Sequence, residues 1–251
     1  MIIKKRRELA HQMVFLTIFG IAMGFLESGV IIYARWLYYP EGFSFPLKPL
    51  DIYSISIEYV REISTIIMLF SISSIAGKRF PEKLSFFLYS FGVWDIFYYV
   101  WLKVILNWPV SFFTWDILFF IPTIWVGPVL APIICSITMI AIAVCILYFD
   151  RKGYPVKISS YEWVLSLLGT FIIFITFVWD YSRIIFEVGF LSSILTLGTN
   201  PAFQQRVVIY IPTEYNWYLF FLGEALILSA LILFWKRMKS CQMNDTALNV
   251  K

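Results

Sequence analysis

Blocks of 20 or more predominantly apolar residues recur along this 251-residue chain. A helix needs about 20 such residues to cross the ~30 Å hydrocarbon core of a bilayer, because each residue adds ~1.5 Å. Composition supports the same reading, since 60% of the residues are hydrophobic and only 14% are charged, against roughly 25% charged in soluble domains. The sequence therefore predicts an all-α integral membrane protein.

We expect six transmembrane helices, each bounded by charges, prolines or interfacial Trp and Tyr residues. Their predicted positions are approximately residues 13–34, 57–77, 84–106, 128–149, 162–184 and 216–235. Residues 1–240 would form a single transmembrane domain, and residues 241–251 a short cytoplasmic tail. The first block is too long for a secretory signal and lacks a small-x-small cleavage site, so we interpret it as a retained helix.

Basic residues mark alternate ends of the predicted helices and so predict the orientation of the bundle. The four clusters lie at residues 4–7, 78–83, 151–157 and 236–239. By the positive-inside rule this side is cytoplasmic, which places both termini inside and the protein in the cell membrane. The same clusters explain the formal charge of +4, so we expect membrane lipids as partners and no nucleic acid.

The connections on the opposite, outer side are longer, and function is expected there. Two apolar stretches within them, residues 112–121 and 186–197, are too short to span a bilayer. The first stretch is bracketed by three prolines, Pro109, Pro122 and Pro128. We therefore expect short interfacial or re-entrant helices on the outer face.

Ionisable residues within the predicted spans are the main functional signal, because each costs at least ~2.5–3.5 kcal/mol in hydrocarbon. Counting ~1.5 Å per residue from the predicted ends places the candidate site residues at mid-membrane or in the outer half. Helical spacing aligns Asp95, Tyr98 and Lys103 on one stripe, and Glu58, Arg61 and Glu62 on another. The candidate site residues are Glu27, Arg61, Glu62, Asp95, Asp180, Arg183 and Glu224, with Lys103, Asp116 and Tyr99 as second choices.

The charge count favours more than ion pairing between helices. The candidate site residues together with Lys103 comprise five acidic and three basic side chains, so two carboxylates lack a partner if all of them converge. Protonation or a bound cation would relieve that excess. With oxygen ligands alone, a divalent cation would be Mg²⁺, Ca²⁺ or Mn²⁺.

Absent residues and motifs exclude several classes of site. The only histidine, His11, precedes the first predicted span on the cytoplasmic side, so no outer histidine is available for haem, for a histidine zinc site or for a Ser-His dyad. There is no GxxxxGK[ST] or GxGxxG loop, so nucleotide binding is not expected. The three cysteines show no spacing typical of a disulfide framework or a metal site.

Three functional hypotheses follow from these features. The first is a membrane-embedded hydrolase or transferase that acts on a lipid or lipid-linked substrate at the outer leaflet, with arginines holding a phosphate. The second is a proton- or cation-coupled transporter. The third is a structural subunit that packs through its charges against a membrane-protein partner. Convergence of the outer charged residues on a cavity would favour a ligand site, and the residues to examine are Arg35, Lys48, Glu187, Arg206 and Glu214.

Overall fold

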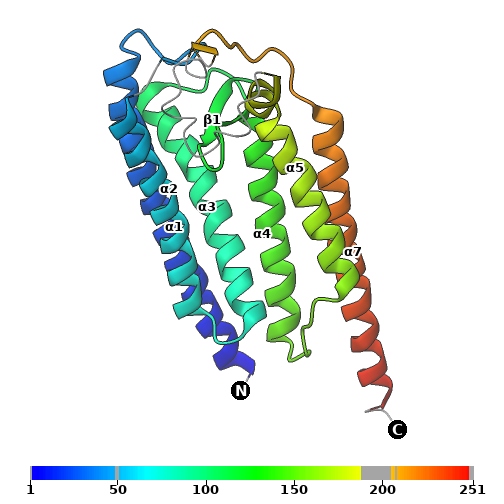
Figure 1. Cartoon of the computed structure of the whole chain (residues 1–251). Coiled ribbons are helices and arrows are strands. Elements are labelled where there is room, and N and C mark those ends of the chain that lie inside the picture. Colours follow the sequence, from blue (N-terminus) through cyan, green and yellow to red (C-terminus); the bar gives the residue numbers. More distant parts are fainter. Residues whose placement is uncertain (1, 49–50, 188–204, 207, 249–251) are drawn as a thin grey trace.

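A bundle of long helices makes up most of the computed structural model, which describes residues 2–48, 51–187, 205–206 and 208–248. The helices stand side by side, and the two ends of the chain lie at the same end of the bundle (Figure 1). Their bounds are α1 Ile2–Tyr38, α2 Ile52–Ala76, α3 Phe80–Leu106, α4 Leu130–Arg151, α5 Ser160–Glu187 and α7 Trp217–Leu248. Each predicted span coincides with one of these helices, which confirms the helical class.

Four of the helices are long and apolar enough to cross a membrane. These stretches are Arg7–Tyr38 in α1, Leu130–Arg151 in α4, Ser160–Ile185 in α5 and Trp217–Cys241 in α7. The helices α2 and α3 are not among them, and both carry several of the charged candidate residues. The helix α7 continues through residues 241–248, into the segment predicted as a cytoplasmic tail.

The helices of the bundle make close contacts in two groups, one around α3 and one between α5 and α7. The helix α3 packs against α1, α2 and α4, while α5 packs along α7, which also contacts α4. The contact between α5 and α7 is backbone to backbone, because a Cβ atom on Gly169 would lie 2.5 Å from the Gly223 carbonyl oxygen. Small residues at such crossings allow this approach in membrane bundles.

A β-hairpin occupies the place of the first predicted outer helix, so that prediction is wrong. Strand β1, Trp115–Phe119, pairs antiparallel with β2, Trp125–Pro128, and places Ile117 opposite Val126. The prolines around the segment oppose a helix, and a short run rich in aromatic and β-branched residues is equally compatible with a strand. Figure 1 shows the hairpin at the end of the bundle away from the termini. The second predicted outer helix, residues 186–197, lies outside the described residues apart from the end of α5.

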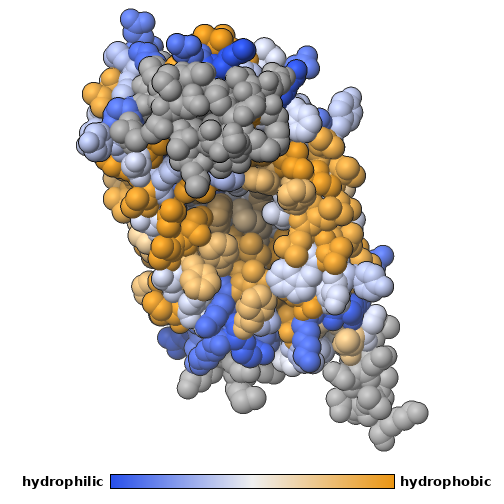
Figure 2. Space-filling model, in the orientation of Figure 1, coloured by the Kyte–Doolittle hydropathy of each residue, from blue (hydrophilic) through white to orange (hydrophobic). Residues whose placement is uncertain are grey.

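The outer surface of the bundle is apolar along its length and hydrophilic toward the end with the termini (Figure 2). Large hydrophobic side chains point outward from several helices, among them Phe15, which is 65% exposed, and Leu167, which is 60% exposed. Such exposure over a broad belt is unfavourable in water and fits contact with lipid. The apolar helices are thus compatible with a membrane location.

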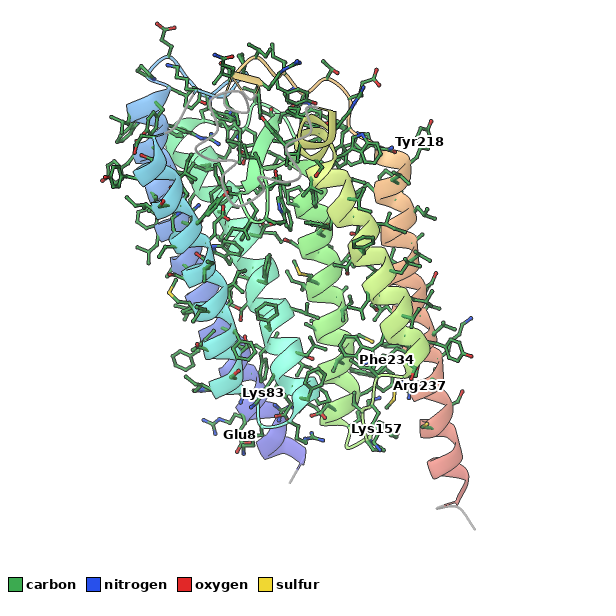
Figure 3. The ribbon with its side chains drawn as sticks, viewed as in Figure 1. Glu8, Lys83, Lys157, Tyr218, Phe234 and Arg237 are labelled. Atoms are coloured by element: carbon green, nitrogen blue, oxygen red, sulfur yellow. The ribbon has the colours of Figure 1, made fainter. Side chains whose placement is uncertain are left out.

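Charged side chains gather at the end of the bundle that holds the termini. Figure 3 shows Glu8, Lys83, Lys157 and Arg237 there, and Tyr218 toward the opposite end. Arg237 joins α7 to the start of α5 through an ion pair of 2.8 Å with Glu162. This polar end bounds the apolar belt, and the hairpin lies at the other end.

Candidate functional site

A cavity of 1030 Å³ lies inside the bundle, between helices α1 to α5 and next to the hairpin. It is as large as the largest typical ligand pockets, which range over ~300–1,000 Å³. Its wall is mostly apolar and rich in aromatic rings, and the same wall carries several charged side chains. Figure 2 shows the surface hollowed between the helices on the left and those on the right, below the grey atoms.

The first charged group on the wall is an ion-pair cluster centred on Arg61 of α2. Its guanidinium contacts Glu58, one turn earlier, with an Nη2–Oε2 distance of 2.6 Å, and it also pairs with Glu27 of α1. The Thr65 hydroxyl donates to the second oxygen of Glu27 at 3.3 Å. The three charged side chains are 13–17% exposed. The cluster therefore links α1 to α2 while it faces the cavity.

The second charged group joins α1 to the hairpin. Arg35 Nη2 donates to Asp116 Oδ1 at 3.0 Å, and both side chains are buried. The guanidinium also lies 3.7 Å from the Trp108 ring centroid and 4.5 Å from that of Phe43, so two aromatic faces stabilise it. Burial raises the pKa of Asp116 to about 6, although Arg35 and hydrogen bonding lower it. This pair fixes β1 over the cavity.

Two further carboxylates on the wall form no ion pair with any residue the structure describes. Both oxygens of Glu62 accept the Phe120 backbone N–H, at 2.9 and 3.0 Å, so α2 holds the turn of the hairpin. Asp95 Oδ2 accepts from the Ser136 hydroxyl at 2.7 Å, which links α3 to α4. Asp95 is partly exposed in the middle of α3, because the cavity reaches it.

The structure brings together only some of the candidate residues. Glu27, Arg61, Glu62 and Asp95 line the cavity, with Asp116 and Tyr99 from the second choices and with Arg35 and Lys48, which the sequence places in a predicted outer connection. Glu58 joins them; it lies on the predicted α2 stripe, and its position three residues before Arg61 was the available signal.

The remaining candidates lie elsewhere. Glu224 accepts from Thr138 at 2.8 Å, so it lies between α7 and α4. Asp180, with Arg183 one turn later on α5, is hydrogen-bonded to Tyr210. Lys103 donates to the Asn107 and Pro109 carbonyl oxygens beyond the end of α3.

The charged residues of the predicted outer connections also divide into those that line the cavity and those that do not. Arg206 and Glu214 are exposed and do not line the cavity, whereas the side chain of Glu187 lies outside the described part of the structure. The outer charges thus converge in part, with Arg35 and Lys48 at the cavity.

The arrangement gives no support to a divalent-cation site. Within the described ranges, no group of three or more His, Cys, Asp and Glu side chains is placed to hold a metal ion. The expectation rested on convergence of the acids, but Glu224 and Asp180 lie away from the cavity, and Glu27 is already paired with Arg61.

No protein-family model, curated protein or solved structure matches this chain. The functional argument therefore rests on the cavity and the residues around it.

The contact between Glu62 and the hairpin turn gives a direct prediction. Replacing Glu62 with alanine removes both acceptors of the Phe120 N–H, and a hydrogen bond to a charged group contributes about 1.5–3 kcal/mol. We expect hydrogen exchange at the Phe120 amide to accelerate roughly 10- to 100-fold. Glu62→Gln, which keeps one acceptor, should have a smaller effect, and Ser64→Ala on the exposed side of α2 should have none. An unchanged Phe120 amide in Glu62→Ala would show that the carboxylate does not hold the turn.

Proposed function

We propose that this protein spans the cell membrane six times, with both termini in the cytoplasm, and that its cavity binds an amphipathic, lipid-like molecule in the outer half of the bilayer. The orientation is supported by the basic side chains near the termini, such as Lys83 and Lys157 (Figure 3). The apolar belt supports the spans, and α2 and α3 pack within the same bundle.

The observation that carries the binding proposal is the cavity itself. Protein interiors are close-packed and leave few voids larger than a water molecule. Charges that served only to join helices would be enclosed by packed neighbours. Here Glu27, Arg61 and Asp95 border 1030 Å³ of space, which a ligand would fill.

The distribution of groups on the wall supports an amphipathic ligand. Charged side chains come from α1, α2, α3 and β1, whereas α4 and α5 contribute mainly apolar side chains such as Met139, Ile173 and Phe174. A polar headgroup would lie against the charged side, and a hydrocarbon tail along α4 and α5. The hollow between α2 and α5 in Figure 2 would let such a tail enter from the bilayer.

Catalysis on a bound lipid-linked substrate is the second candidate, and one observation favours it. Glu62 and Asp95 are carboxylates without an ion-pair partner among the described residues, so either could accept a proton from a ligand. A membrane-embedded hydrolase or transferase would use them in this way.

A substitution that fills the cavity tests the binding proposal. Thr170 lines the cavity and is exposed, so Thr170→Trp should occupy space without disturbing helix packing. We expect native mass spectrometry of the protein, released gently from its own membranes, to show one bound lipid-like molecule in the wild type and about tenfold less in Thr170→Trp. The matched control is Leu167→Trp, one turn away on the outward face of α5, which should retain the ligand. Equal occupancy in all three proteins would contradict the proposal.

A further inference from the structure

We infer that the amphiphile in this cavity carries a cationic headgroup, such as an ammonium or quaternary ammonium ion. The inference rests on the proposed binding function and names the ligand class for the same cavity. Both a phosphate-bearing ligand and a cationic one are compatible with a cavity that contains arginines and carboxylates. The pairing of those charges distinguishes the two.

The cavity wall carries more acidic than basic side chains. Five carboxylates and three cationic side chains line it: Glu27, Glu58, Glu62, Asp95 and Asp116, with Arg35, Lys48 and Arg61. The formal excess is two negative charges. Such an excess in a low-dielectric site favours a bound cation and opposes an anion.

The arginines that a phosphate would need are already engaged. Arg61 is held by two carboxylates, and Arg35 by Asp116 and by the rings of Phe43 and Trp108. Arg35 Nη1 has no hydrogen-bond partner among the described residues, but a phosphate bound there would add to the negative charge of the wall. The third cation, Lys48, is exposed at the rim, where water screens it.

The carboxylates also have unused hydrogen-bonding and ion-pairing capacity. Glu62 and Asp95 form no ion pair in the described part of the chain. Asp116 is 2% exposed, and its Oδ2 atom has no hydrogen-bond donor within bonding distance among the described residues. A cationic head would supply the ion-pair partner that Glu62 and Asp95 lack.

Aromatic residues share the cavity wall with Asp95, which has no ion-pair partner among the described residues. Phe91, Trp94 and Tyr98 line the cavity from α3 together with Asp95, which lies between them in sequence. The Phe91 and Trp94 rings meet edge to face at 5.0 Å. Aromatic rings contribute to the recognition of quaternary ammonium groups, because the ring quadrupole attracts a weakly hydrated cation.

Three amphiphiles with the same tail test the headgroup. Decyltrimethylammonium, decyl phosphate and decyl glucoside would be titrated against the full-length protein in nanodiscs, with the thermal unfolding midpoint as the readout. Thr170→Trp, with its cavity filled, gives the background from partition into the bilayer. We expect the ammonium compound to bind about tenfold more tightly than the other two.

Variants that remove a carboxylate charge test whether the preference for the ammonium compound comes from the cavity. Asp95→Asn removes one charge but keeps an acceptor for Ser136, and it should reduce the preference for the ammonium compound severalfold. Glu62→Gln provides the same test should Asp95→Asn fail to fold. The matched control, Glu224→Gln, removes a buried carboxylate outside the cavity and should leave the preference unchanged.

The outcomes separate the headgroup from the binding function. One outcome is that the phosphate or the glucoside binds in the cavity as tightly as the ammonium compound or more tightly. That result would overturn the inference of a cationic headgroup and leave the binding function in place. A preference unaltered in both cavity variants would also overturn it. If none of the three compounds shifts the wild type more than Thr170→Trp, the proposed binding function itself fails.

Discussion

Arg61→Met should lower the free energy of unfolding by about 3–5 kcal/mol, because it leaves two carboxylates in a low-dielectric interior without their counter-ion. Arg61 is the only described cation in ion-pair contact with Glu27 and Glu58, which come from different helices. The loss of stability should therefore include the contribution of the contact between α1 and α2. Chemical unfolding in detergent micelles, followed by far-ultraviolet circular dichroism, measures it.

Two controls test whether the loss of stability in Arg61→Met comes from the unpaired carboxylates. Arg7→Met removes an exposed cation on α1 and should change the free energy of unfolding by less than about 0.5 kcal/mol. Adding Glu27→Gln and Glu58→Gln to Arg61→Met should restore much of the loss, since the uncompensated charges are gone. A loss in Arg61→Met no larger than in Arg7→Met would contradict the buried cluster.

Gly169→Ala should destabilise the protein by about 1–3 kcal/mol or more, through overpacking between α5 and α7. Its Cβ atom would lie 2.5 Å from the Gly223 carbonyl oxygen and 2.7 Å from Ile227 Cγ1, so the two backbones would have to separate. The same unfolding experiment measures the change.

The matched control for Gly169 is Gly29→Ala in α1. Nothing lies within 4 Å of the added Cβ atom there, and alanine is favoured over glycine in a helix by roughly 0.5–1 kcal/mol. We expect this variant to gain stability by that amount. A gain of similar size at both positions would show that the contact of α5 with α7 is looser than the structure has it.

The positions of the helices could be predicted because the bilayer imposes a length on each apolar run. Charges and prolines mark the ends of such runs, and the six predicted spans coincide with six helices. The hairpin could not be predicted in this way. Trp115 and Ile117 pair with Pro128 and Val126, and pairing between short segments depends on contacts that local periodicity does not specify.

The depth of the candidate residues could be estimated from helical rise, but their direction around the helix could not. Glu27 and Glu62 are both predicted at mid-membrane or in the outer half, and both line the cavity. Glu224 was placed in the same outer half, yet α7 packs against α5 and α4, and its carboxylate contacts Thr138 of α4. Helix packing decides this direction, and one sequence contains too little information to fix it.

The central claim is that a lipid-like molecule occupies the cavity, and photo-crosslinking in the living membrane tests it most directly. Cells fed a fatty acid with a diazirine near its end would carry the label in many lipids, and mass spectrometry would map the labelled residues. We predict crosslinks on Met139 and Phe174, which line the cavity, that disappear in Thr170→Trp. Crosslinks confined to lipid-facing residues such as Ile137 and Leu167 would contradict the claim.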